Sequence, residues 1–227
     1  MARLPALIDT LAARDTRGRP TVEHIARVVR EAGFIQTTGR GRGAAEMTES
    51  DAASLIIGLN ASESPGEAGD RVEIFRKLTP VVPHNMEAPP ELKRVVAASN
   101  FGAAMEALIL SANEIDNLKA SSQESFAQMM ADLEDPLSAV TGYSLRDLSF
   151  ALKVTFAVPE PVAKISIRWT GIGRVPSSGA IDLSYWQSTG RTRKSKADDK
   201  QLDRAVTVAI GFRTIREVHR LLWPEEN

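Results

Sequence analysis

The chain has 227 residues, a formal net charge of −1 and 43% hydrophobic residues, which is typical of a globular protein with one large or two small domains. It has no cysteine, which excludes disulfide bonds, thiolate zinc sites and a cysteine nucleophile. No run of about 18 apolar residues and no apolar N-terminal segment is present, so we expect neither a membrane span nor a signal peptide and predict a cytoplasmic location.

The first sixty residues predict three helices. A second helix is expected from Thr21, as its N-cap, to Gly33, as a left-handed C-terminal residue. Thr48 and Asp51 form a capping-box pair that predicts the start of the third helix. Apolar residues at helical spacing define the buried faces of the first and second helices, at Leu4, Leu7, Ile8 and Leu11 and at Val22, Ile25, Ala26 and Val29.

A segment rich in glycine and arginine separates the second and third helices, at residues 37–43. Glycine permits close backbone approach, and arginine binds guanine bidentately or enters a narrow minor groove. Residues 17–44 hold six arginines and two glutamates, a local charge of +4. The pattern predicts a winged helix-turn-helix head over residues 1–61, with a solvated loop and helix face as the alternative. The predicted DNA-binding residues are Arg19, His24, Arg27, Arg30, Arg40 and Arg42.

The order of these elements resembles the winged-helix head of MerR-type regulators. The resemblance rests on the letters REAGFI, the Gly/Arg turn and the helix capped by Thr-x-x-Asp, and it covers about residues 4–60. The head is also similar to N-terminal modules of phage-associated bacterial proteins. Ala26-Arg27-Val28-Val29 stand in place of the Arg-Tyr-Tyr signature, and Pro65-Gly66 interrupt the expected dimerisation helix. The resemblance implies a DNA-binding head and no effector or metal site.

The middle of the chain is acidic. Residues 63–138 carry thirteen acidic and six basic residues, a net charge of −7, which suits packing or a protein partner. Four prolines in residues 79–90 predict an irregular connection, so residues 62–90 are expected to link the head to an oligomerisation or partner-binding domain over 91–227. Helices are expected near residues 68–78, 91–98, 101–112 and 121–133, with Asn100 capping the third of them.

After Pro136 the apolar period changes from that of helices to that of strands. Residues 150–158, 165–169 and 181–185 alternate between apolar and other side chains, which predicts a small antiparallel meander and an overall α+β fold class. Residues 204–210 fit a fourth strand or the start of a last helix, which is expected to cover the open sheet face. A secondary nucleic-acid contact is proposed at Arg191, Arg193, Lys194 and Lys196, with a solvated loop as the favoured alternative.

No catalytic or metal-binding motif is found in the sequence. His24, His84 and His219 are scattered and lack the spacing of metal ligands. There is no phosphate-binding Gly-rich loop, no nucleophile elbow and no paired carboxylate motif outside the lysine-rich loop that holds Asp198 and Asp199. We therefore expect no enzymatic activity, no cofactor and no metal.

These features predict a transcriptional regulator, associated with a phage or mobile element, that binds double-stranded DNA through its head. A homo-oligomer is expected, with a dimer favoured because two heads then reach successive groove faces. One alternative is a packaging protein resembling a small terminase subunit, which would form a ring. Another is a non-catalytic adaptor whose head binds a protein.

Overall fold

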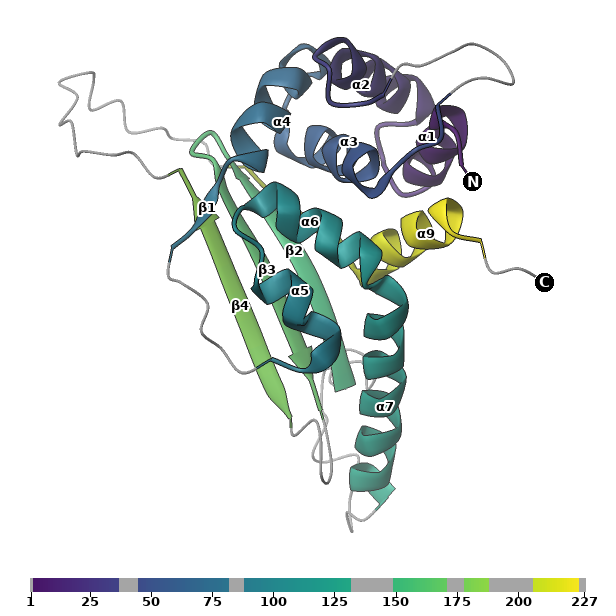
Figure 1. The fold of residues 1–227 in the computed structure, drawn as a ribbon, viewed down its shortest axis with the longest axis vertical. Helices are drawn as coiled ribbons and strands as arrows, with labels where there is room; N and C mark the ends of the chain where they lie inside the picture. The colour runs from purple at the N-terminus through teal and green to yellow at the C-terminus, as the bar shows by residue number, and fades with distance from the viewer. Residues whose placement is uncertain are drawn as a thin grey trace, which may run out of the picture.

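The computed structural model describes residues 2–36, 45–81, 88–131, 149–170, 178–187 and 206–224. These residues form eight α-helices and one five-stranded antiparallel sheet (Figure 1). The predicted α+β class is therefore confirmed. No helix within these ranges is long and apolar enough to cross a lipid bilayer.

Four helices form a bundle at one end of the molecule, at the top of Figure 1. Helix α3 lies inside this bundle and packs against α2 and α4 and, beyond them, against α6 of the following segment. A 3-10 turn at Pro65–Glu67 lies between α3 and α4. The helices are α1 (Leu4–Ala12), α2 (Arg19–Glu31), α3 (Glu49–Ala61) and α4 (Ala68–Arg76).

Helix α2 begins earlier than the sequence predicted and ends as predicted. Its N-cap is Gly18, with φ 81°, so the prediction of Thr21 as N-cap is wrong. Pro20 lies in the first turn, where its missing N–H costs no helical hydrogen bond. At the other end Gly33 has φ 85°, and the N–H of Phe34 donates to the carbonyl of Val29 at 3.1 Å. This is the Schellman motif that glycine favours.

Helix α3 starts with the predicted capping box. The Thr48 hydroxyl accepts from the Asp51 N–H at 3.2 Å, and the Asp51 carboxylate accepts from the Thr48 N–H at 2.8 Å. The same carboxylate accepts from the N–H of Gln36 at 2.9 Å, which fastens the segment after α2 to the start of α3.

The segment after the bundle contains a short strand and three more helices. Thr79–Pro80 forms β1, which pairs with the last residues of β4 where an irregular linker was predicted. A proline is tolerated there because β1 is an edge strand. The Asn100 cap is confirmed, since its Oδ1 accepts from the Ala103 N–H at 2.9 Å. The helices are α5 (Lys93–Val96), preceded by a 3-10 turn, α6 (Phe101–Leu110) and α7 (Ala112–Ala131).

The sheet has the strand order β1-β4-β3-β2-β5, and every neighbouring pair is antiparallel. The three predicted strands are present as β2, β3 and β4, and the ambiguous 204–210 segment contributes strand β5 beside β2. The long strands are β2 (Phe150–Val158), β3 (Val162–Trp169), β4 (Gly179–Trp186) and β5 (Val206–Gly211).

Helices pack on one face of this sheet. Phe101 of α6 lies between Phe156 of β2, at 5.6 Å between ring centroids, and Tyr185 of β4, at 5.4 Å. Phe75 of α4 packs against Phe156 at 6.1 Å. Helix α9 (Phe212–Leu222) packs against α1, α6 and α7 and also touches β2 and β5. The buried hydrophobic residues form one continuous cluster that runs from the bundle to the sheet.

Candidate nucleic-acid interface

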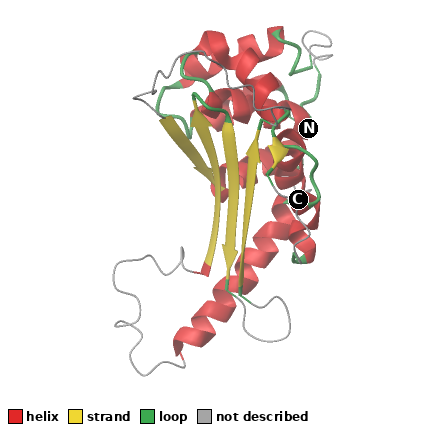
Figure 2. Ribbon diagram, turned by 90° about the vertical axis from the view of Figure 1, so that its left-hand side faces the viewer, coloured by secondary structure: helices red, strands yellow, loops and turns green. Residues whose placement is uncertain are grey.

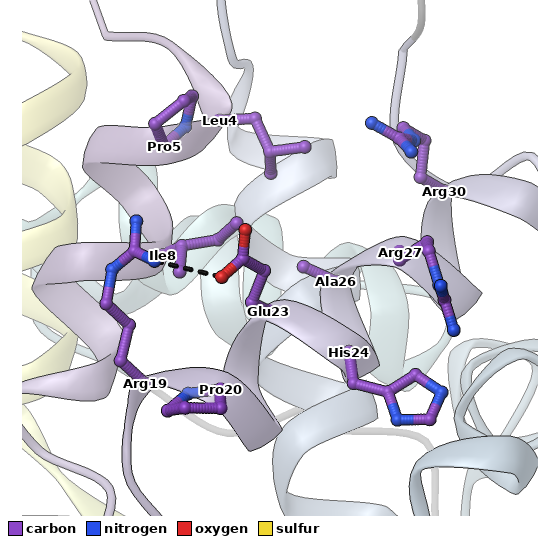
Figure 3. Close-up of a pocket in the computed structure, with 10 residues that line it drawn as sticks. All are labelled: Leu4, Pro5, Ile8, Arg19, Pro20, Glu23, His24, Ala26, Arg27 and Arg30. Carbon is purple, nitrogen blue, oxygen red and sulfur yellow. Dashed lines mark hydrogen bonds and ion pairs between the residues drawn. The ribbon is translucent and has the colours of Figure 1, made fainter.

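The predicted DNA-binding residues that the structure describes lie on one surface. Arg19, His24, Arg27 and Arg30 all project from the exposed side of α2. Residues 19, 23, 27 and 30 are spaced by four, four and three, so they follow one another along the same helix face. We call this region the α1–α2 surface (Figure 3). It comprises Arg19, Glu23, His24, Arg27 and Arg30 of α2 and Leu4, Pro5 and Ile8 of α1.

The α1–α2 surface is hollowed between its two helices. The cavity has a volume of about 620 Å³. Its apolar lining comes from Leu4, Pro5 and Ile8, and its charged lining comes from α2. In Figure 3, His24 and Arg27 lie to one side of the Arg19–Glu23 pair.

Carboxylates compensate two of the three arginines on this surface. Arg19 donates to Asp9 of α1 at 2.7 Å and to Glu23 at 2.9 Å. The hydrogen bond to Asp9 is the largest cause that raises the pKa of Arg19. Arg27 lies 3.9 Å from Glu31. These pairs are exposed, and water screens them strongly.

The other two predicted residues carry no such compensation. Among the described residues, neither His24 nor Arg30 takes part in an ion pair, and both side chains are exposed. His24 lies in the second turn of α2 and Arg30 in the last turn, so the middle and C-terminal part of the helix offers the donors that are free to bind an anion.

Arg17 contributes to the charge of the head but has a structural role. Its guanidinium pairs with Asp15 at 2.5 Å and donates to the carbonyl of Leu59 at 2.5 Å. This contact fastens the α1–α2 connection to the end of α3, where helix carbonyls lack partners. Part of the local charge of +4 in the sequence is therefore used inside the bundle.

Six of the predicted contact residues lie outside the described residues. They belong to the Gly/Arg segment and to the segment that precedes β5 in the sequence, and the structure places none of them. They are Arg40, Arg42, Arg191, Arg193, Lys194 and Lys196.

A second cavity, of about 880 Å³, lies between α7, the start of β2 and the start of α9. Its apolar lining includes the edge-to-face pair of Phe150 and Phe212, 5.7 Å apart, and the Nζ of Lys119 lies 5.8 Å from the Phe212 ring. The cations at this cavity are compensated: Arg216 lies 3.3 Å from Asp116, and Lys119 lies 4.0 Å from the same carboxylate. Sequence reasoning missed this cavity because its lining comes from three distant segments.

Within the described part of the chain, no three histidine, aspartate or glutamate side chains are grouped as metal ligands would be. No protein-family model, curated protein or solved structure matches the chain.

Proposed function

We propose that the protein binds duplex DNA through the α1–α2 surface, with α2 as the helix that enters the major groove. The observation that carries this proposal is the placement of Arg19, His24, Arg27 and Arg30 on the exposed side of one helix. Helix α3 is unsuited to the same role because ten of its thirteen residues are buried. A recognition helix needs a free polar face that fits the groove.

The described contacts suggest how the binding energy is divided. His24 and Arg30 have no ion pair among the described residues, so they bind phosphate or base edges without breaking an existing interaction. Arg19 and Arg27 exchange weak, exposed ion pairs for phosphate contacts. Release of counterions from the DNA then drives association.

The proposal includes a wing formed by the Gly/Arg segment after α2. Arg40 and Arg42 belong to this segment and would contact the minor groove or the backbone beside the recognition helix. We further propose a homo-oligomer, in which a dimer places two heads one helical turn of DNA apart. A regulator of this kind is the function we favour, and a packaging ring is the alternative with the same DNA-binding head.

A protein-binding adaptor is the second candidate, and one observation favours it. The arginines of the α1–α2 surface alternate with Glu23, Glu31 and Asp9, so the surface is closer to neutral than the sequence count suggests. Mixed charges around an apolar hollow suit a protein partner with a complementary pattern.

Binding of mixed-sequence duplex DNA at several salt concentrations tests the proposal. The intact chain is compared with Arg27→Gln/Arg30→Gln, which removes two cations from the surface. Each lost phosphate contact reduces the magnitude of the negative slope of log K against log salt by about 0.9, so the double variant should reduce it by about 1.8. Lys93→Gln/Arg94→Gln removes the same charge from exposed positions of α5 and should leave the slope unchanged.

Two further measurements separate the alternatives. Arg40→Ala/Arg42→Ala should weaken binding if the wing takes part. Light scattering on the same samples distinguishes a dimer from a ring of many subunits. Absence of binding to any duplex at low salt would refute DNA binding by the head and favour the adaptor, because non-specific phosphate attraction is strongest under those conditions.

A further inference from the structure

One face of the sheet is left open by the described helices. Figure 2 shows the helices packed against one side of the strands, with no described element over the central part of the other side. We call this other side the outward face. It consists of the odd-numbered residues 151–157 of β2, the even-numbered residues 162–168 of β3 and 180–186 of β4, and Thr207, Ala209 and Gly211 of β5.

The outward face carries an excess of positive charge. Lys153, Lys164 and Arg168 are its cations, and Asp182 is its one carboxylate among the described strand residues. Lys153 is paired in register with Ser166, so Lys164 and Arg168 are its two diagonal neighbours on β3. Such neighbours lie about 7–8 Å apart, which spreads the three cations across two adjacent strands.

Only one of these cations is neutralised within the described part of the chain. The Nζ of Lys164 lies 3.1 Å from Asp182, whose carboxylate also accepts from the Ser166 hydroxyl at 2.6 Å. The hydroxyl is the largest cause that lowers the pKa of Asp182, and Lys164 and Arg168 lower it further. Lys153 and Arg168 are exposed and form no ion pair there, so the face offers two free cations.

The other end of the outward face exposes an aromatic ring. Trp186 is 52% exposed, and Val162, its partner in register on β3, is 37% exposed. Val81, which follows β1 and donates its N–H to Ser184 at 2.9 Å, is 41% exposed and shares this side by strand alternation. Most other outward residues are alanine, serine or threonine, which leave the strands accessible.

We propose that the outward face binds single-stranded nucleic acid, with an unpaired base stacked on Trp186 and the following phosphates bound by Lys164, Lys153 and Arg168. An exposed aromatic ring beside a line of cations is the combination with which sheets bind single strands. Stacking on the ring requires a base with a free face. A duplex does not offer one, so this surface is distinct from the proposed duplex-binding head.

The other occupants fit the same face less well. A second copy of the chain, packed face to face, would oppose Lys153 and Arg168 with like charges, which disfavours association. An acidic protein would satisfy the cations but would not require Trp186. The contribution of this ring therefore distinguishes a nucleic acid from a generic polyanion.

The test uses the full chain and fluorescein-labelled oligo-dT and oligo-U of about 12 nucleotides, a length within the range of known single-strand sites. Fluorescence anisotropy at several salt concentrations should show binding by the intact protein. Trp186→Ala should weaken it about tenfold, and Trp186→Phe, which keeps a ring, should weaken it less. Lys153→Gln/Arg168→Gln should reduce the magnitude of the negative slope of log K against log salt by about 1.4, because each single-strand phosphate contact contributes about 0.7.

A matched control tests whether the loss of any two surface cations explains the result. Lys93→Gln/Arg94→Gln removes two exposed cations from α5 and should leave single-strand binding unchanged. The proposal is overturned if neither oligonucleotide binds, if Trp186→Ala binds as the intact chain does, or if poly-glutamate competes as well as an oligonucleotide.

Discussion

Helices α2 and α3 have the same length, thirteen residues each, but opposite surroundings. Helix α2 buries one stripe of four residues and exposes charged side chains around the rest. Helix α3 is buried on nearly all sides, including Asp51 and Ser54. One helix is therefore available for binding, and the other is the centre around which the bundle is packed.

The largest effect should come from a cavity in α3. Leu55 is fully buried, so Leu55→Ala should lower the free energy of unfolding by about 2–5 kcal/mol, the range for deleted core leucines. Chemical denaturation measures this. Arg27→Ala, on the exposed side of α2, is the contrasting variant and should change stability by less than about 0.5 kcal/mol. Similar losses in the two variants would contradict the proposed division of roles.

The second effect concerns the buried carboxylate of α3. Asp51→Ala removes the acceptor of the Gln36 and Thr48 N–H groups, and burial prevents water from replacing it fully. The free energy of unfolding should fall by about 1–3 kcal/mol. Glu46→Ala, at an exposed position of the same segment, should leave it nearly unchanged. A neutral result for Asp51→Ala would show that the capping box contributes little.

The third effect tests the close approach of α2 and α3. A Cβ at Gly58 would lie 2.7 Å from the Cγ2 of Val29 and 3.3 Å from the Cγ2 of Val72. Valine is stiff in a helix, so Gly58→Ala should cost about 1–2 kcal/mol even though alanine is the better helix former. Gly66→Ala has no atom within 4 Å of its added Cβ and serves as the control. A stabilised Gly58→Ala would mean that the helices can separate slightly at no cost.

The smallest effect on stability should accompany a large effect on binding. Arg27→Gln/Arg30→Gln should leave the thermal midpoint of unfolding nearly unchanged, because both side chains are exposed and Arg27 has only a distant ion pair. The same double variant should lower duplex affinity at low salt. If the thermal midpoint and the duplex affinity fell together, these arginines would be needed for folding, and the loss of affinity would not show that they contact DNA.

The two exposed surfaces also differ from each other in charge. Arg19 and Arg27, two of the three arginines of the α1–α2 surface, are paired with Asp9, Glu23 and Glu31, whereas the outward face of the sheet sets three cations against Asp182. The density of arginine in the sequence indicated the first surface. The sequence did not indicate the second surface, because Lys153, Lys164 and Arg168 lie on two strands and become neighbours only through the register of those strands.

Several local features followed from the sequence by itself. The capping box of Thr48 and Asp51, the Asn100 cap and the left-handed Gly33 depend on side-chain and backbone chemistry within a few residues. Strands β2 to β4 followed from strict alternation, because a sheet with one buried face demands that period. Thr21 was wrongly predicted as a cap because Gly18 caps α2 three residues earlier, with Pro20 in the first turn.

Other features were decided by tertiary structure. The short strand Thr79–Pro80 exists because β4 offers it a partner, and residues 206–211 became a strand because β2 had a free edge. The complete burial of α3 depends on α2, α4 and α6 surrounding it, which no period of its own residues reveals. The charge of the head shows the same division. The sequence determined how many arginines it has, and the folded chain decided which of them pair with carboxylates, which fasten the bundle and which face solvent, because these outcomes depend on neighbours far away along the chain.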